Sequence, residues 1–175
     1  MNKIEARKLF KVEIKLITSE ESKNRRDELV SLLSNLDSFK NAQKVGLYYP
    51  LKYELDLTIL MELYPKKKYY FPRVITDSLN FYLVNDLSEL KPSLFSLKEP
   101  LEGTILEREI DLYLVPCLLT SSNYRIGHGA GFYDKYFAKY DGFKVGIVQK
   151  RFKNLEIENH DHDIPMDVIL WQQLS

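Results

Sequence analysis

Short apolar segments of the kind found in buried β-strands recur along this chain, and helical segments separate several of them. They lie at residues 45–49, 69–71, 81–84, 111–116, 144–148 and 168–170. The run at residues 111–116, Asp-Leu-Tyr-Leu-Val-Pro, is typical of a parallel strand buried on both faces. Strands that alternate with helices favour a largely parallel sheet. We therefore expect an α/β fold with three layers, α/β/α.

Helical patterns lie on both sides of the first predicted strand. Residues 3–17 form one helix, and residues 18–21, Thr-Ser-Glu-Glu, are a capping box that begins a second. The apolar positions that can share one face of the first helix are Ile4, Leu9, Val12 and Leu16. Asp56 is a candidate N-cap for a helix that Pro65 ends, and a further helix is predicted at about residues 131–139.

The composition limits which partners the protein can be expected to bind and in which compartment it is expected to occur. Twenty-five basic residues balance 25 acidic ones, so no overall charge favours nucleic acid or an anionic membrane. A single cysteine excludes an internal disulfide and a zinc framework, and no run approaches the roughly 20 apolar residues of a spanning helix. The first residues lack the apolar stretch of a signal peptide. We expect residues 1–175 to be one domain of a cytoplasmic, monomeric protein without nucleic-acid or membrane partners.

The most informative segment for chemistry is residues 125–134, Arg-Ile-Gly-His-Gly-Ala-Gly-Phe-Tyr-Asp. Three glycines at alternate positions allow positive φ and let the backbone amides approach a ligand closely. Arg125 adds a bidentate donor for phosphate oxygens, and Asp134 has the hard oxygen ligands that Mg²⁺ prefers. The spacing matches neither the P-loop nor the dinucleotide fingerprint, and tight turns are the alternative explanation. The loop alone predicts an anion site.

Several separate motifs, in the same order, resemble the 5-formyltetrahydrofolate cyclo-ligase family over almost the whole chain. The family has a strand D-L-hydrophobic-V-P followed by R-L-G-x-G-x-G-Y-Y-D, which residues 111–116 and 125–134 resemble. Ala130 and Phe132 depart from the usual residues of that loop. The other matching segments are Lys3 with Arg7, Tyr49 with Glu54, Pro72-Arg73, residues 95–100 and residues 162–167.

The resemblance implies a Rossmann-like fold of the cyclo-ligase type and an ATP- and Mg²⁺-dependent enzyme. ATP would phosphorylate the formyl oxygen of 5-formyltetrahydrofolate, and nitrogen 10 would then close the ring to give 5,10-methenyltetrahydrofolate, with ADP and phosphate released. Lys3 and Arg125 would have catalytic roles, and Asp134 and Asp163 would hold Mg²⁺. The ATP-binding residues would be Lys3, Arg7, Arg125, Ile126, Gly127, His128, Gly129, Ala130, Gly131, Phe132 and Tyr133. The folate-binding residues would be Arg7, Tyr49, Glu54, Phe95, His128, Gly129, Ala130, Gly131 and Phe132.

Each of these residues also has an ordinary explanation. Lys3 and Arg7, one turn apart, would normally be a solvated helix face, and Glu54 a surface carboxylate. Tyr49 and Phe95 are the kind of residue that a core contains. A transition-metal site at residues 160–163, His-Asp-His-Asp, lacks a matched ligand elsewhere, and a lone Cys117 is usually a small buried hydrophobe.

Two other functions compete with the cyclo-ligase reaction. One is a non-catalytic folate- or nucleotide-binding relative, against which the retained charges of Lys3, Arg125, Asp134 and Asp163 argue. The other is a sugar-phosphate isomerase or an acyl-transfer enzyme on a similar sheet, since a fold does not determine a function. Neither explains residues 95–100 together with the glycine loop.

Overall fold

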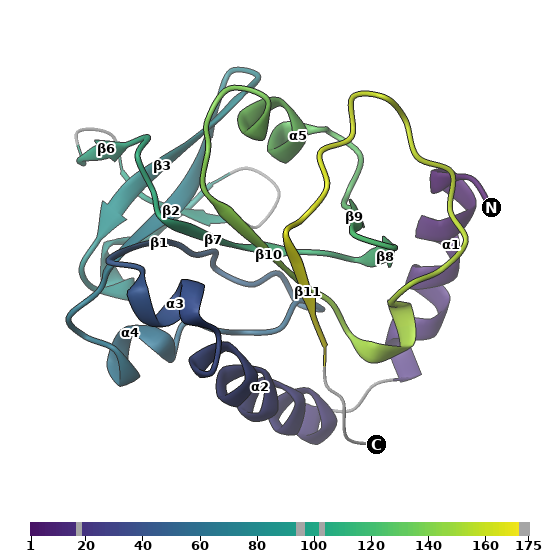
Figure 1. The fold of residues 1–175 in the computed structure, drawn as a ribbon, viewed down its shortest axis with the longest axis horizontal. Helices are drawn as coiled ribbons and strands as arrows, with labels where there is room; N and C mark the ends of the chain where they lie inside the picture. Colours follow the sequence, from purple (N-terminus) through teal and green to yellow (C-terminus); the bar gives the residue numbers. More distant parts are fainter. Residues whose placement is uncertain (17–18, 94–96, 102–103, 172–175) are drawn as a thin grey trace.

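In the described part of the chain, residues 1–16, 19–93, 97–101 and 104–171, the computed structural model has a central seven-stranded mixed sheet (Figure 1). Five neighbouring strands are parallel, and β3 and β6 continue the sheet antiparallel at one edge. The order is β11 (Val168–Leu170), β10 (Phe143–Ile147), β7 (Leu112–Pro116), β1 (Lys44–Gly46), β2 (Lys68–Ile75), β3 (Ser78–Val84) and β6 (Leu106–Glu107). The expected α/β fold with a mostly parallel sheet is confirmed.

Helices cover both faces of this sheet, which gives the three predicted layers. On one face lie α2 (Ser19–Ser34), α3 (Asp37–Asn41) and α4 (Leu60–Leu63), and Figure 1 shows α5 (Phe132–Phe137) on the opposite side. Leu33, Phe39 and Leu60 from the first group pack against Leu112 and Leu114 of β7. Tyr136 and Phe137 of α5 pack against the other face, on β3 and β7.

The buried strand β7 behaves as its sequence predicts, because every one of its residues is buried. Tyr113 fills the space under α5, where its hydroxyl lies 2.6 Å from that of Tyr136. A Cβ at Gly46 or at Gly142 would collide with the Tyr113 ring. These two glycines therefore leave room for the largest fully buried side chain in the described structure.

The N-terminal helix α1 (Lys3–Glu13), which continues as a 3₁₀ turn over Ile14–Leu16, lies beside the small hairpin of β8 (Leu119–Ser121) and β9 (Tyr124–Ile126). The predicted apolar face of this helix is wrong. Ile4, Leu9, Val12 and Leu16 are exposed. The buried side chains are Ala6, Phe10 and Ile14, which join a cluster with Leu119 and Phe152. Because the buried face of α1 differs from the predicted one, Lys3 and Arg7 point toward the protein.

The remaining elements are short. They are the 3₁₀ turns Leu87–Glu89 and Lys150–Phe152 and the two-stranded sheet of β4 (Lys91–Pro92) and β5 (Lys98–Glu99). Asp56 was expected to cap α4, but its carboxylate accepts hydrogen bonds from Thr58 in the turn before that helix. The predicted capping box includes Thr18, which lies outside the described residues. In the described part, no helix has both the length and the apolar character needed to cross a membrane.

Candidate active site

Arg125 connects the glycine loop to the carboxyl end of β7. Its Nε donates a hydrogen bond of 2.9 Å to the carbonyl of Pro116, the last residue of that strand. Its guanidinium lies 4.6 Å from the centre of the Tyr133 ring, a cation–π contact with the first turn of α5. Ligands of open α/β sheets bind beyond the carboxyl ends of the strands, so Arg125 lies where the fold predicts a binding site.

The three loop glycines are required for two different reasons. A Cβ at Gly127 would collide with the guanidinium of Arg125, so this glycine gives the arginine its space. Gly129 and Gly131 have φ of +113° and +71°, which side chains disfavour. The positive φ that the sequence predicted is therefore present at two of the three positions.

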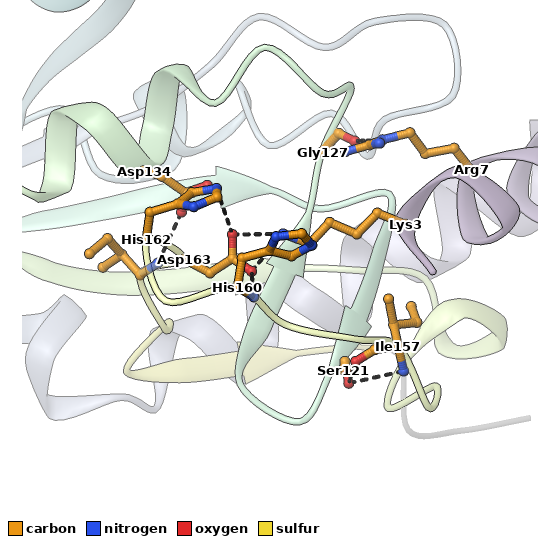
Figure 2. Close-up of polar contacts among 10 residues, drawn as sticks. Lys3, Arg7, Ser121, Gly127, Asp134, Ile157, His160, His162 and Asp163 are labelled. Atoms are coloured by element: carbon orange, nitrogen blue, oxygen red, sulfur yellow. Dashed lines mark hydrogen bonds and ion pairs between the residues drawn. The ribbon is translucent and has the colours of Figure 1, made fainter. Parts of the chain in front are cut away.

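A second guanidinium reaches the same loop from α1. Arg7 Nε donates a hydrogen bond of 2.8 Å to the carbonyl of Gly127 (Figure 2), and a Cβ at Gly129 would lie 3.4 Å from Arg7 Cζ. Partial desolvation, together with the positive charges of Arg125, Arg7 and Lys11, lowers the pKa of His128. Two arginines and a glycine-rich backbone at one place are well suited to bind a polyanion.

Lys3 is held by an acidic residue from the far end of the chain. Its Nζ lies 2.7 and 2.5 Å from the two carboxylate oxygens of Asp163, and the amide of His160 donates to Oδ2 at 2.7 Å (Figure 2). Burial alone would raise the pKa of Asp163, but these hydrogen bonds and the charge of Lys3 outweigh it and lower that pKa. Lys3 lies one turn of α1 from Arg7, and the pair with Asp163 holds its side chain in place.

The two predicted magnesium ligands come together on neighbouring segments. Asp134, in the first turn of α5, accepts a hydrogen bond of 3.0 Å at Oδ1 from the amide of Ile164, the residue after Asp163. Mg²⁺ usually takes one or two carboxylates and completes its shell with phosphate and water oxygens. Asp134 has a carboxylate of the type that Mg²⁺ prefers, whereas the carboxylate of Asp163 is paired with Lys3. Among the described residues, no group of three or more acidic, histidine or cysteine side chains is arranged to hold a metal.

A small cavity of about 10 Å³, roughly the space of one water molecule, lies next to Arg125 at the carboxyl ends of β1, β7 and β10. Its walls include Phe10, Tyr48, Tyr53, Glu54, Leu55, Pro116, Cys117, Leu118, Ile147 and Gln149. Glu54 accepts a hydrogen bond of 2.8 Å from the Leu51 amide. Burial raises the pKa of Glu54, and that amide and the charge of Arg125 only partly oppose the rise. A half-buried carboxylate facing such a cavity is best stabilised by a ligand that brings N–H donors.

The structure also bears on the alternatives for single residues. Burial raises the pKa of Cys117 to about 11, so its thiol stays protonated near neutral pH, as expected of an inert cysteine. Tyr49 is half-buried near the end of β1, with Lys98 Nζ 4.8 Å from the centre of its ring. Phe95 lies outside the described residues.

Gln149 is a cavity residue to which the sequence assigned no role. It is buried and donates a hydrogen bond of 3.2 Å to the carbonyl of Tyr53. Its place directly after a buried strand, where ligand-binding loops begin, was the signal that could have identified it.

Comparisons with known proteins show the family to which the chain belongs. The model of the 5-formyltetrahydrofolate cyclo-ligase family matches residues 1–172. The chain belongs to this family. A 5-formyltetrahydrofolate cyclo-ligase of Mycoplasma genitalium is 26% identical to it over 151 residues, which cover 82% of this chain and 79% of that protein. The predicted family is therefore confirmed.

Two solved structures are similar to this cyclo-ligase family member. A 5,10-methenyltetrahydrofolate synthetase of Aquifex aeolicus, solved by NMR, has a TM-score of 0.86 and 30% identity, covering 99% of this chain and 91% of its own. The 5,10-methenyltetrahydrofolate synthetase of Mycoplasma pneumoniae has a TM-score of 0.77 at 21% identity, with 97% and 98% covered, and supports the fold alone.

Proposed function

We propose that this cyclo-ligase converts 5-formyltetrahydrofolate to 5,10-methenyltetrahydrofolate, with ATP hydrolysed to ADP and phosphate, where α1, the glycine loop and the strand ends meet. The cyclo-ligase activity follows from the family, which uses ATP. The observation that supports this location is the convergence of Arg7 and Arg125 on one glycine loop beside the cavity that Glu54 lines. A polyanion and a flat, N–H-rich ring would thus bind next to each other.

The first step needs charge neutralisation more than proton transfer. The formyl oxygen of the folate attacks the γ-phosphorus, and the bond from that phosphorus to the β–γ bridging oxygen breaks, releasing ADP. Arg125, Arg7 and the loop amides would bind the phosphate oxygens and offset the charge that develops on them. The formyl oxygen carries no proton, so this step requires no general base.

The second step closes the ring. Nitrogen 10 attacks the formyl carbon, the bond between that carbon and the phosphorylated oxygen breaks, and the departing phosphate takes the proton of nitrogen 10. Glu54 would hold the pterin by accepting its N–H donors, and the rise in its pKa would be reversed by those bonds. With the pterin fixed at one end and the phosphates at the other, the reacting atoms would be held close together.

Lys3, Asp163 and Asp134 would complete the phosphate end. Lys3 lies one turn of α1 from Arg7, which contacts the loop, and would turn from Asp163 to the triphosphate. Asp134 and Asp163 would hold Mg²⁺, which would supply positive charge to offset that of the triphosphate.

The function is tested by measuring ADP release and methenyl absorbance together. ADP should form only when 5-formyltetrahydrofolate is present, and one methenyl product should appear per ADP. Folate binding without either product would instead support the non-catalytic relative. Turnover of a sugar phosphate or an acyl donor, with none of the folate, would support the other enzyme classes.

The proposal also extends to the organisation of the protein. Residues 1–175 would be one cyclo-ligase domain, acting as a monomer in the cytoplasm. Light scattering on the purified chain tests the monomer: a mass near 20.6 kDa supports it, and twice that mass overturns it.

A further inference from the structure

The segment that follows the undescribed residues 94–96 is firmly attached to the sheet. Glu99 of β5 accepts a hydrogen bond of 2.6 Å from the Val74 amide of β2, and its other carboxylate oxygen bonds to the Ser93 hydroxyl. The Arg73 guanidinium donates to the carbonyl of Pro100 at 3.4 Å. These contacts fix the backbone of β5, and Lys98 of this strand reaches Tyr49 in the loop after β1 that also carries Glu54.

This attachment determines where Lys98 points. Neighbouring residues of a strand face opposite sides, so with Glu99 turned to β2 the side chain of Lys98 faces away from it. Lys98 lies over the ring of Tyr49, with Nζ 4.8 Å from the ring centre. In the described structure, Lys98 has no carboxylate partner, whereas Lys3 and Lys44 are each paired with one. Its charge is therefore available to an anionic ligand beside Tyr49.

The folate substrate carries such an anion at the end opposite the pterin. Its glutamate has two carboxylates, and each added glutamyl unit contributes one more. We infer that Lys98 binds the glutamyl tail of the folate and favours substrates with more carboxylates. The inference rests on the proposed function, with the pterin at Glu54 and the glutamyl tail extending toward Tyr49.

The test compares Lys98→Gln with wild type on three substrates: 5-formyltetrahydropteroate, which lacks glutamate, and the mono- and triglutamyl forms of 5-formyltetrahydrofolate. The loss should fall on KM and not on kcat, by up to about fivefold for the triglutamate, the size expected of an exposed ion pair. The pteroate, which keeps only the benzoate carboxylate, should be the least affected by the substitution. Added salt should reduce the difference between wild type and variant.

Lys91→Gln is the matched control, because Lys91 is an exposed lysine of the paired strand β4. It should leave all three KM values at wild-type level. An equal loss in Lys98→Gln for the pteroate would mean that Lys98 acts only through Tyr49, and unchanged KM values would mean that it has no part in binding; either overturns the inference.

Calorimetry of the three folates without ATP separates this inference from the proposed function. If wild type binds them but forms no methenyl product, the proposed function fails, and the Kd values of Lys98→Gln still decide the role of the lysine. If wild type binds none of them, both proposals fail.

Discussion

At the scale of single residues, Arg125 connects the two halves of the candidate site. It contacts the end of β7 through Pro116 and the first turn of α5 through Tyr133, and Gly127 leaves room for it. Its charge also influences the pKa of groups on both sides, His128 in the loop and Glu54 in the cavity. One guanidinium thus contributes to the electrostatics of both the glycine loop and the cavity, where desolvation is the larger cause.

Replacing Arg125 should therefore affect both binding and rate. Arg125→Ala should lower kcat by about a hundredfold or more, the usual effect of losing one preorganised donor to a developing charge. ATP affinity should fall as well, and Arg125→Lys should recover part of it by restoring the charge without the bidentate donor. Arg151→Ala is the control, since Arg151 is exposed and pairs with Glu13. Near-normal ATP binding and rate in Arg125→Ala would remove this residue from the phosphate site.

Glu54 should show a conflict between stability and function. Its pKa is higher in the folded protein than in the unfolded chain, so wild type loses stability as the pH rises from the unfolded pKa through the folded one. Glu54→Gln keeps an acceptor for the Leu51 amide and removes this loss. Urea unfolding should show the variant to be the more stable protein at neutral pH, with the advantage shrinking toward pH 4. Folate affinity should fall about tenfold or more, because a charged acceptor is lost. Equal stabilities of wild type and Glu54→Gln from pH 4 to neutral pH would contradict the raised pKa of Glu54.

At the scale of elements, the glycine loop depends on two separate constraints that matched variants can tell apart. Gly131→Ala adds a methyl group in open space at φ +71°, so its cost is backbone strain of about 1 kcal/mol in urea unfolding. Gly127→Ala displaces the guanidinium of Arg125 and causes no strain at a positive φ, so its stability cost should be smaller and its loss of ATP affinity larger. The reverse order of these effects would mean that Arg125 does not depend on the space at Gly127.

The elements also show what the sequence could predict. Apolar runs located all five parallel strands, because burial on both faces leaves a continuous hydrophobic signature. The predicted buried face of α1 was wrong: three of the four apolar positions chosen, Ile4, Val12 and Leu16, are well exposed. The buried side is determined by contacts that α1 makes with the distant glycine loop and with Phe152. A helical pattern gives the spacing of apolar residues along one segment, but it does not show which other segment will pack against it.

The same limit applies to the site. The glycine loop and Arg125 were predictable because the chemistry lies within ten consecutive residues. The pairing of Lys3 with Asp163, the cavity contact of Gln149 and the position of Lys98 over Tyr49 were not, since each joins segments distant in sequence. Sequence alone gave the residue types of the site and not their partners.

At the scale of the whole molecule, the N-terminal region meets the segment that precedes β11 at the candidate site. Besides the Lys3–Asp163 pair, the rings of Phe10 and Phe152 lie 4.8 Å apart, and the Glu158 amide donates to the Met1 carbonyl at 3.0 Å. Figure 1 shows α1 set apart from the sheet, beside the loop that precedes β11. The proposed phosphate end of the site would therefore be complete only when α1 is folded against residues 152–163.

The pairing of Lys3 with Asp163 leads to a prediction about Mg²⁺, because Asp163 would have to hold the ion as well. Asp134→Asn removes a carboxylate without another cation partner in the described structure, so the phosphoryl step should slow by about a hundredfold or more while ATP still binds. Asp163→Asn should have a milder effect, because it also frees Lys3 for the triphosphate. The decisive measurement is a Mg²⁺ titration of the cyclisation rate in wild type and both variants. Weakened ion binding predicts partial rescue at high Mg²⁺ in each variant, with the half-saturation point shifted further for Asp134→Asn. Three superimposable curves would show that neither carboxylate takes part in holding the ion.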